Sequence, residues 1–337
     1  MIIDSTGYPA EHLPVSTEQH ETYGLVHEYA IGRYTIKVPE GFYVRSQNTY
    51  FDGIAVREVK WPETMKADDG FEQLWDEHLT KLKNRAARSL KNPKFNVTKS
   101  KMNNYTLYTS FYYDHTGEPY ELVTQEIYRP KINVHKLVNY DTHGVWFYNS
   151  GLVTDKDTLE ASLNALIEDY EPYAHPGQAE IQSGSFHMKR GVVKRPFDKN
   201  ESMAAGFFRR DDNGRFGINI QTETRYQRTD IKKYREFPNS FSQLRSYSKT
   251  KPKKIRYAKR TIANYPGYEY IIHYKEQKNP EYRDGSFRAW YSNTHYKNMY
   301  PEVSFHTVLY ATKDFNRQVD IWDFILNSFS KIAHQEN

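Results

Sequence analysis

Histidines, paired carboxylates and hydroxyl nucleophiles are the side chains whose types and spacing could do chemistry in this sequence. Its 13 histidines include no His-Glu-x-x-His motif, and His135 with His143 lacks the spacing of a ligand pair. Asp211-Asp212-Asn213-Gly214 lacks the acidic alternation and closing glutamate of a calcium loop, so a hairpin turn explains it better. The chain has no cysteine, which excludes thiolate ligands and cysteine nucleophiles. We therefore predict no metal site.

Enzymatic sequence motifs are missing as well. The nucleophile elbow Gly-x-Ser-x-Gly, the phosphate loop Gly-x-x-x-x-Gly-Lys and the dinucleotide fingerprint Gly-x-Gly-x-x-Gly do not occur. The carboxylate pair Asp68-Asp69 precedes a helix pattern, where negative charge suits the positive helix N-terminus. We therefore predict a protein that is not an enzyme and takes no cofactor, with a hydrolase whose site is assembled only in space as an alternative.

Basic residues gather in the second half of the chain. Residues 1–175 hold 18 Lys and Arg against 25 Asp and Glu, whereas residues 176–337 hold 29 against 17. This separation indicates an acidic partner for the second half, or two lobes that attract each other. The densest basic run, residues 249–260, contains Tyr257 as a candidate stacking platform for a nucleic-acid base. No recognition motif accompanies it, so we favour a solvated surface over nucleic-acid or anionic-lipid binding.

Membrane and export signals are not evident in the sequence. No apolar stretch reaches the roughly 18 residues that a transmembrane helix needs, so no transmembrane segment is predicted. Residues 1–7 have neither the basic nor the apolar region of a secretory leader. The lack of cysteine is compatible with reducing and oxidising compartments alike.

The order of predicted elements repeats on either side of a linker at residues 171–178, where two prolines and a glycine follow a helix pattern. The first half contains predicted strands at 32–39, 53–61, 95–97, 106–113, 122–128, 134–140 and 145–148, with helices around 71–82 and 159–167. The second half contains predicted strands at 185–192, 203–210, 215–222, 254–259, 268–274, 287–291 and 303–310, with helices at 237–248 and around 319–329.

One pair of segments strengthens this repetition. Residues 94–105 align without a gap with residues 254–265, with identical residues at four positions. We therefore predict an α+β fold of two tandem similar domains, 22–172 and 181–333, in a two-lobed molecule. Each domain is expected to be a mainly antiparallel sheet with helices on one face.

Several motifs, taken in order, resemble one known family. They are Gly32-Arg33-Tyr34, Pro266-Gly267-Tyr268-Glu269-Tyr270, Phe287-Arg288-Ala289-Trp290, Tyr300-Pro301-Glu302-Val303-Ser304-Phe305 and Ile321-Trp322-Asp323-Phe324-Ile325-Leu326-Asn327-Ser328-Phe329. These are similar to the strands and the closing helix of immunity proteins that neutralise type VI secretion lipase effectors, in the family paired with the fourth lipase group. Asn293-Thr294-His295-Tyr296-Lys297 departs from the Gly/Ser-rich turn of that pattern.

The resemblance implies a non-enzymatic inhibitor that binds a cognate phospholipase effector and blocks access to its active site or the opening of that site. It also implies two lobes that grip the enzyme and a periplasmic location, with the leader peptide absent from this chain. We further expect a monomer when free and no nucleic-acid partner. The motif residues themselves are interpreted as framework, because Trp290 and Trp322 are large enough to anchor a core.

Contacts with the effector are expected from the variable loops, not from the framework. Tyrosine and arginine are the residue types that dominate tight protein interfaces. The expected effector-binding residues are Tyr112, Tyr113, Arg209, Arg210 and Tyr296.

Overall fold

The fold is taken from a computed structural model of the chain. It describes residues 14–61, 65–89, 95–102, 105–114, 120–122, 125–127, 131–173, 181–196, 201–211, 214–223, 253–274, 285–292, 302–312 and 314–332. The chain divides into two compact units. Unit 1 consists mainly of Ala10–Asp52 and Tyr173–Asn337, and unit 2 mainly of Gly53–Pro172.

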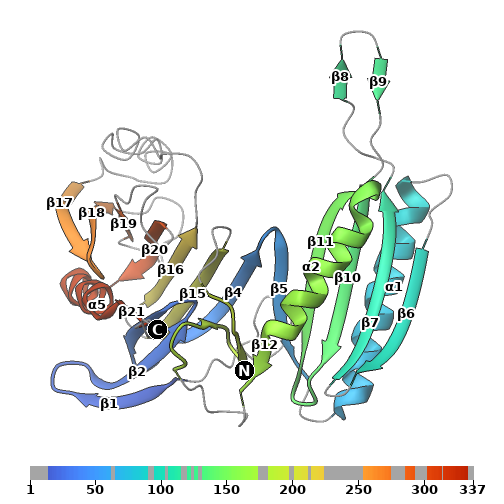
Figure 1. The fold of residues 1–337 in the computed structure, drawn as a ribbon. Coiled ribbons are helices and arrows are strands. Elements are labelled where there is room, and N and C mark those ends of the chain that lie inside the picture. Colours follow the sequence, from blue (N-terminus) through green and yellow to red (C-terminus); the bar gives the residue numbers. More distant parts are fainter. Residues whose placement is uncertain are drawn as a thin grey trace. The chain divides into compact units, whose positions relative to one another are not determined.

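Unit 2 is built around an antiparallel sheet with the strand order β5-β11-β10-β7-β6 (Figure 1). These strands are β5 (Ile54–Lys60), β6 (Phe95–Met102), β7 (Tyr105–Asp114), β10 (Lys131–Asn139) and β11 (His143–Leu152). The helices of the unit are α1 (Ala67–Ser89), the 3-10 helix η1 (Val153–Asp155) and α2 (Lys156–Asp169). Strands β8 (Tyr120–Leu122) and β9 (Gln125–Ile127) pair with each other, and β12 (Tyr170–Pro172) ends the unit.

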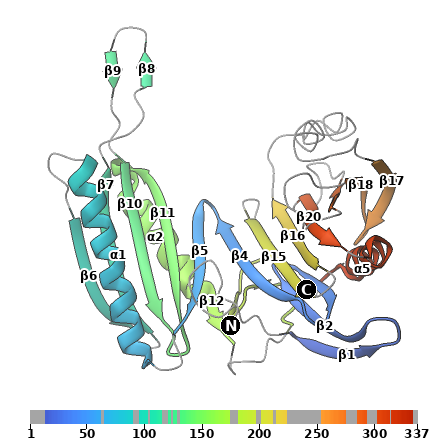
Figure 2. The same cartoon turned by 180° about the vertical axis from the view of Figure 1, so that it is seen from behind.

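Helices α1 and α2 cover opposite faces of this sheet, as Figures 1 and 2 show from the two sides. On β10, Leu137 packs in a core cluster with Phe71 and Trp75 of α1, whereas the preceding Lys136 bonds Asn164 of α2. Successive strand residues point to opposite faces, so the two helices lie on different sides. The expectation of helices on one face is therefore wrong for unit 2. Helical periodicity showed that each helix has an apolar side, but not which sheet face it covers.

Unit 1 contains a sheet with the strand order β17-β18-β19-β20-β16-β15-β4 and a smaller sheet with the order β1-β2-β3-β21. The strands of the larger sheet are β4 (Tyr43–Phe51), β15 (Glu201–Asp211), β16 (Gly214–Glu223), β17 (Lys253–Ile262), β18 (Tyr265–Tyr274), β19 (Gly285–Ser292) and β20 (Glu302–Thr312). The smaller sheet contains β1 (Ser16–His20), β2 (Gly24–Ile31), β3 (Tyr34–Pro39) and β21 (Ser330–Lys331), and helix α5 spans Phe315–Ser328.

The two units share a strand order. In unit 1, neighbouring strands of the sheet follow the order β17-β18-β19-β20-β16. In unit 2 the corresponding order is β6-β7-β10-β11-β5, so in each unit the first strand of the series along the chain pairs with the last. Each series is followed by a helix, α5 or α2. The segments that align in sequence form equivalent hairpins, with Met102↔Tyr105 in one and Ile262↔Tyr265 in the other. This order agrees with the expected repetition, and an origin by duplication stays a prediction.

The N-terminal strands pack against the C-terminal end of the chain. Thr35 of β3 pairs with Ser330 of β21, and the Tyr34 ring stacks on Phe329 at a centroid distance of 4.6 Å. The backbone N–H of Lys37 donates to Oγ of Ser328 at 2.9 Å. Residues 24–39 thus fold with the second half of the chain, although the sequence pattern groups them with the first.

Most predicted elements are confirmed, including the three helices at α1, α2 and α5 and the hairpin β15–β16, which is paired up to Asp211↔Gly214. The single strand predicted at 185–192 is wrong. There the short strands β13 (Phe186–His187) and β14 (Gly191–Val193) form a hairpin. The helix predicted at 237–248 lies outside the described residues. No helix in the described part of the chain is both long and apolar enough to cross a membrane.

Candidate functional site

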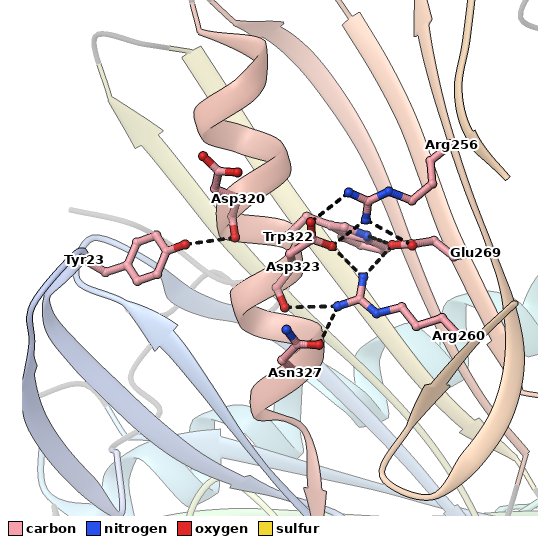
Figure 3. A network of polar contacts seen from close by, with 8 residues as sticks. All are labelled: Tyr23, Arg256, Arg260, Glu269, Asp320, Trp322, Asp323 and Asn327. Carbon is pink, nitrogen blue, oxygen red and sulfur yellow. Dashed lines mark hydrogen bonds and ion pairs between the residues drawn. The ribbon is translucent and has the colours of Figure 1, made fainter. Parts of the chain in front are cut away.

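A network of charged side chains joins helix α5 to strands β17 and β18 in unit 1 (Figure 3). Trp322 and Ile325 of α5 are buried and three residues apart, so they lie on the side of the helix that faces the core. Asp323 and Asn327 are four residues apart and lie on the flank of the helix that contacts Arg260 of β17. Helical spacing therefore separates an apolar side of α5, which faces the core, from a polar flank, which contacts β17.

Glu269 of β18 is the buried centre of this network, with only 1% of its surface exposed. Its carboxylate accepts hydrogen bonds from Nε1 of Trp322 at 2.7 Å, from Arg260 at 2.8 Å and from Arg256 at 3.2 Å. A buried carboxylate is tolerated when hydrogen bonds and opposite charges replace its hydration. Glu269 meets that condition, and its role is to hold α5 on the sheet.

Asp323 gives the two arginines a second carboxylate. Arg256 donates two bonds to it, at 2.7 and 2.9 Å, and Arg260 donates one at 2.6 Å. Burial alone would raise the pKa of Asp323, but the hydrogen bonds from Arg256 and Arg260 outweigh burial and lower the pKa below its usual value. The two carboxylates and the two guanidinium groups compensate one another, so the network braces α5 against the sheet.

Tyr23 joins the turn between β1 and β2 to the opposite side of α5 (Figure 3). Its hydroxyl donates to the carbonyl oxygen of Asp320 at 3.1 Å, and its ring lies 4.5 Å from the ring of Phe324. Burial, reinforced by the negative charges of Asp320 and Asp323, raises the pKa of Tyr23. The tyrosine therefore stays protonated and keeps its hydrogen bond to the helix.

Strand β17 presents most of its remaining side chains to solvent, although Ile262 is buried. It is the terminal strand of the described sheet, and Ile255 and Tyr257 are 40% and 36% exposed. The Lys254 ammonium lies 4.7 Å from the centroid of the Tyr257 ring, a cation–π distance. The lysines of the strand are exposed, and a register shift falls at Ile255; both features also protect edge strands from unwanted pairing. The exposed lysines give this surface a positive charge that suits an acidic partner.

Sequence reasoning missed that Arg256 and Arg260 belong to the brace and treated them as part of the exposed basic run. Both are held by Glu269 and Asp323, so the run offers less free positive charge than its composition indicates. A usable signal was present: residues 256 and 260 are an even number of positions apart in a strand and therefore share a face.

A second buried ion pair fixes the start of β3. Arg33 is 2% exposed and donates from Nε to Glu201, 1% exposed, at 2.8 Å. The same guanidinium donates to the carbonyl oxygens of Gly184 at 2.8 Å and Arg195 at 2.9 Å. Gly32 before it has a φ of 58°, a left-handed conformation that glycine adopts without strain. Gly32 and Arg33 are thus framework residues.

Histidines and carboxylates form structural contacts in the described residues. His143 and the Tyr170 hydroxyl are 2.7 Å apart, and that hydroxyl donates to Glu58 at 2.7 Å, so Nε2 of His143 is the donor to Tyr170. His135 stacks on Tyr148 at a centroid distance of 4.4 Å. Among the described residues, no group of three or more histidine, aspartate or glutamate side chains is placed to hold a metal ion.

The expected effector-binding residues are distributed over both units. Tyr112 and Tyr113 lie on β7 in unit 2, and Arg209 and Arg210 lie on β15 in unit 1. Arg209 is half-buried, with its guanidinium 5.9 Å from the ring of Phe42. Tyr296 lies outside the described residues, and a role for all five in binding stays a prediction.

The described residues thus define an α+β protein whose most elaborate polar network is a brace.

Comparison with solved structures finds proteins with a similar fold. The apo structure of the immunity protein TplEi of the type VI secretion system of Pseudomonas aeruginosa matches with a TM-score of 0.63 at 12% identity, over 92% of this chain and 98% of that one. TplEi complexed with "L" peptide matches with a TM-score of 0.57 at 13% identity, over 93% and 99%. A chain of the Tle4–Tli4 complex matches with a TM-score of 0.61 at 12% identity, over 92% and 98%.

No protein-family model and no curated protein match the sequence. The structural neighbours are nevertheless type VI secretion immunity proteins, and they match over nearly their whole length. The resemblance predicted from the motifs is therefore confirmed as a likeness of fold.

Proposed function

We propose that this chain is an immunity protein that binds a cognate type VI secretion phospholipase effector and inhibits it. The observation that carries the proposal is the match over 92% of this chain and 98% of each of two neighbours, TplEi and a chain of the Tle4–Tli4 complex. One of those structures contains a second protein, which is the kind of partner the proposal requires. Inhibition acts by blocking access to the active site of the effector or by preventing that site from opening.

The chemistry of the described residues supports a binding role. Charged groups that are buried or half-buried in the described residues, those of the brace of α5 and of the Arg33–Glu201 pair, are engaged in structural ion pairs. Exposed tyrosine, isoleucine and lysine side chains on β17 suit contacts with a protein surface. The proposal includes a periplasmic location and a free monomer, which cell fractionation and light scattering will test.

The test mixes the purified chain with the phospholipase encoded beside its gene and records affinity and turnover together. We expect nanomolar binding and loss of turnover at one equivalent of the chain. A catalytically inactive effector should bind equally well, because inhibition requires contact and not turnover. If the two proteins neither bind nor inhibit, the likeness is one of fold alone.

The alternative function, binding of nucleic acid or anionic lipid by the basic surface, makes a different prediction. Its affinity would fall steeply with salt, because released counterions drive such binding. The ion pairs of Arg256 and Arg260 weigh against it, since they remove two cations from the run that would carry it.

A further inference from the structure

Unit 2 contains a cavity that none of these interactions uses. It has a volume of about 410 Å³ and lies between helix α1 and the strands β5, β10 and β11. We call it the ring cavity and define it by its walls, His78, His135, Trp146 and Tyr148, and its mouth, Arg57, Glu77 and Lys81. Cavities of this size accommodate small ligands or large side chains.

The strand register explains why these side chains meet. Tyr148 of β11 pairs with Ala55 on β5 and with His135 on β10, and Trp146 pairs with Arg57. Paired residues share a face of the sheet, and alternate residues along a strand return to it. All of them therefore face α1. The small Ala55 opposite Tyr148 leaves space that a larger side chain would fill.

The walls form a continuous series of ring contacts. Trp75 stacks on Trp146 with 5.7 Å between centroids, and His78 lies 4.6 Å from Trp146 and 4.5 Å from His135. His135 in turn stacks on Tyr148 at 4.4 Å. Aromatic rings favour offset or edge-to-face neighbours at about 4.5–7 Å, so another ring can extend this series.

The mouth of the ring cavity is polar and exposed. Glu77 and Lys81 lie 3.9 Å apart on successive turns of α1. Within the described residues, no carboxylate forms an ion pair with Arg57, whose planar guanidinium suits a carboxylate. Burial, together with the charge of Lys81, lowers the pKa of His78 to about 4, so this wall is neutral at pH 7. The ring cavity is therefore lined by aromatic rings, and Arg57 at its mouth has no carboxylate partner among the described residues.

We propose that the ring cavity receives an aromatic side chain of the effector, with a neighbouring carboxylate of the effector on Arg57. This proposal rests on the proposed function and names one of its contact points. The contacts that dominate protein interfaces are aromatic and arginine side chains in well-formed pockets. The charged mouth is formed by both α1 and β5, which gives an acidic polypeptide segment a surface to cross beside the cavity.

The experiment measures the affinity of the effector for wild type and for variants of the full chain by calorimetry. Ala55→Phe fills the cavity, and Arg57→Glu reverses the charge at its mouth. Arg317→Glu makes the same substitution at an exposed residue of α5, outside the ring cavity and the β17 surface, and serves as the control. Because Arg57 is exposed, its variant keeps the proposal testable if Ala55→Phe does not fold. Phenylacetate, an aromatic carboxylate, is added at millimolar concentration as a competing probe.

We expect Ala55→Phe and Arg57→Glu to weaken binding at least tenfold and Arg317→Glu to change it less than twofold. Phenylacetate should weaken the wild-type complex and leave that of Ala55→Phe unaffected. Tight binding by wild type and by both cavity variants would overturn this proposal and leave the proposed function standing. No binding by wild type would overturn both. An equal loss in Arg317→Glu, or phenylacetate binding without competition, would also overturn it.

Discussion

In both units the shared strand order is followed by a helix that covers a buried charge. The two buried charges have opposite signs. In unit 1, helix α5 covers the carboxylate of Glu269, which receives hydrogen bonds from Trp322 and two arginines. In unit 2, helix α2 covers the ammonium group of Lys136, which is 2% exposed, bonds Asn164 and lies 3.7 Å from a carboxylate oxygen of Glu160. A shared strand order therefore fixes where the helix lies but not the polar chemistry beneath it.

The two buried charges differ in how completely they are compensated. The arginines that reach Glu269 are also bound by Asp323, so the brace is a cluster of four charges. Burial lowers the pKa of Lys136, and Glu160, one-third exposed, opposes that shift only in part. We infer that the brace under α5 is the stronger one, and that removing a member from it is the more damaging change.

The largest expected effect is that of Glu269→Ala in the brace. The substitution leaves Nε1 of Trp322 unpaired in the core and removes a buried counter-charge from Arg256 and Arg260. We expect a loss of about 3–5 kcal/mol in the free energy of unfolding, measured by urea denaturation. Glu18→Ala, which removes the partner of an exposed ion pair with Lys37, should lose less than about 1 kcal/mol. Equal losses would refute the assignment of Glu269 as the centre.

A buried neutral histidine of unit 1 should make stability depend on pH. Burial, with a smaller contribution from Arg33, lowers the pKa of His187 to about 4, although a hydrogen bond with Gln182 opposes the shift. Between about pH 6.5 and 4 the unfolded chain therefore binds a proton that the native state does not. The free energy of unfolding should fall by about 3 kcal/mol as the pH drops through that window. In His187→Gln the fall in unfolding free energy that is due to this histidine should disappear. If the free energies of unfolding of wild type and His187→Gln fall in parallel with pH, the lowered pKa is not that of His187.

A smaller effect is expected at Gly144 of β11 in unit 2. A Cβ atom there would lie 2.8 Å from Cζ2 of Trp61, which is buried in the core beneath α1. Gly144→Ala should therefore cost about 1–3 kcal/mol of unfolding free energy through overpacking. Gly217→Ala on β16 is the matched control, since its nearest contact would be an ordinary 3.5 Å. A difference between the two of less than about 0.5 kcal/mol would show that the α1 face is loosely packed.

The smallest of these effects is that of Glu160→Ala under α2. Lys136 keeps its hydrogen bond to Asn164, and Glu160 is partly hydrated already, so we expect a loss of about 1 kcal/mol by urea denaturation. Asn164→Ala removes the nearer partner of the ammonium group and should cost more. An equal loss of unfolding free energy for Glu160→Ala and Glu269→Ala would contradict the inference that the brace under α5 is stronger than the contacts of Lys136 under α2.

Part of the candidate brace could be anticipated from the sequence. The motif resemblance identified Glu269, Trp322 and Asp323 as framework, and they are the residues that meet under α5. Their partners Arg256 and Arg260 were assigned to a basic surface, because charge counting along a chain does not show which charges are neutralised in space. The ring cavity was not foreseen at all, since its walls come from α1, β10 and β11 and only the register brings them together.

By itself the sequence determined the α+β class, the three helices α1, α2 and α5, the hairpin β15–β16 and the repeated order of elements. These follow from local periodicity and turn residues, which act within a few positions along the chain. Only the tertiary structure decided that α1 and α2 take opposite faces and that β3 pairs with β21, nearly 300 residues later. Periodicity shows that an element has an apolar side; which distant element covers that side depends on the packing of the whole core.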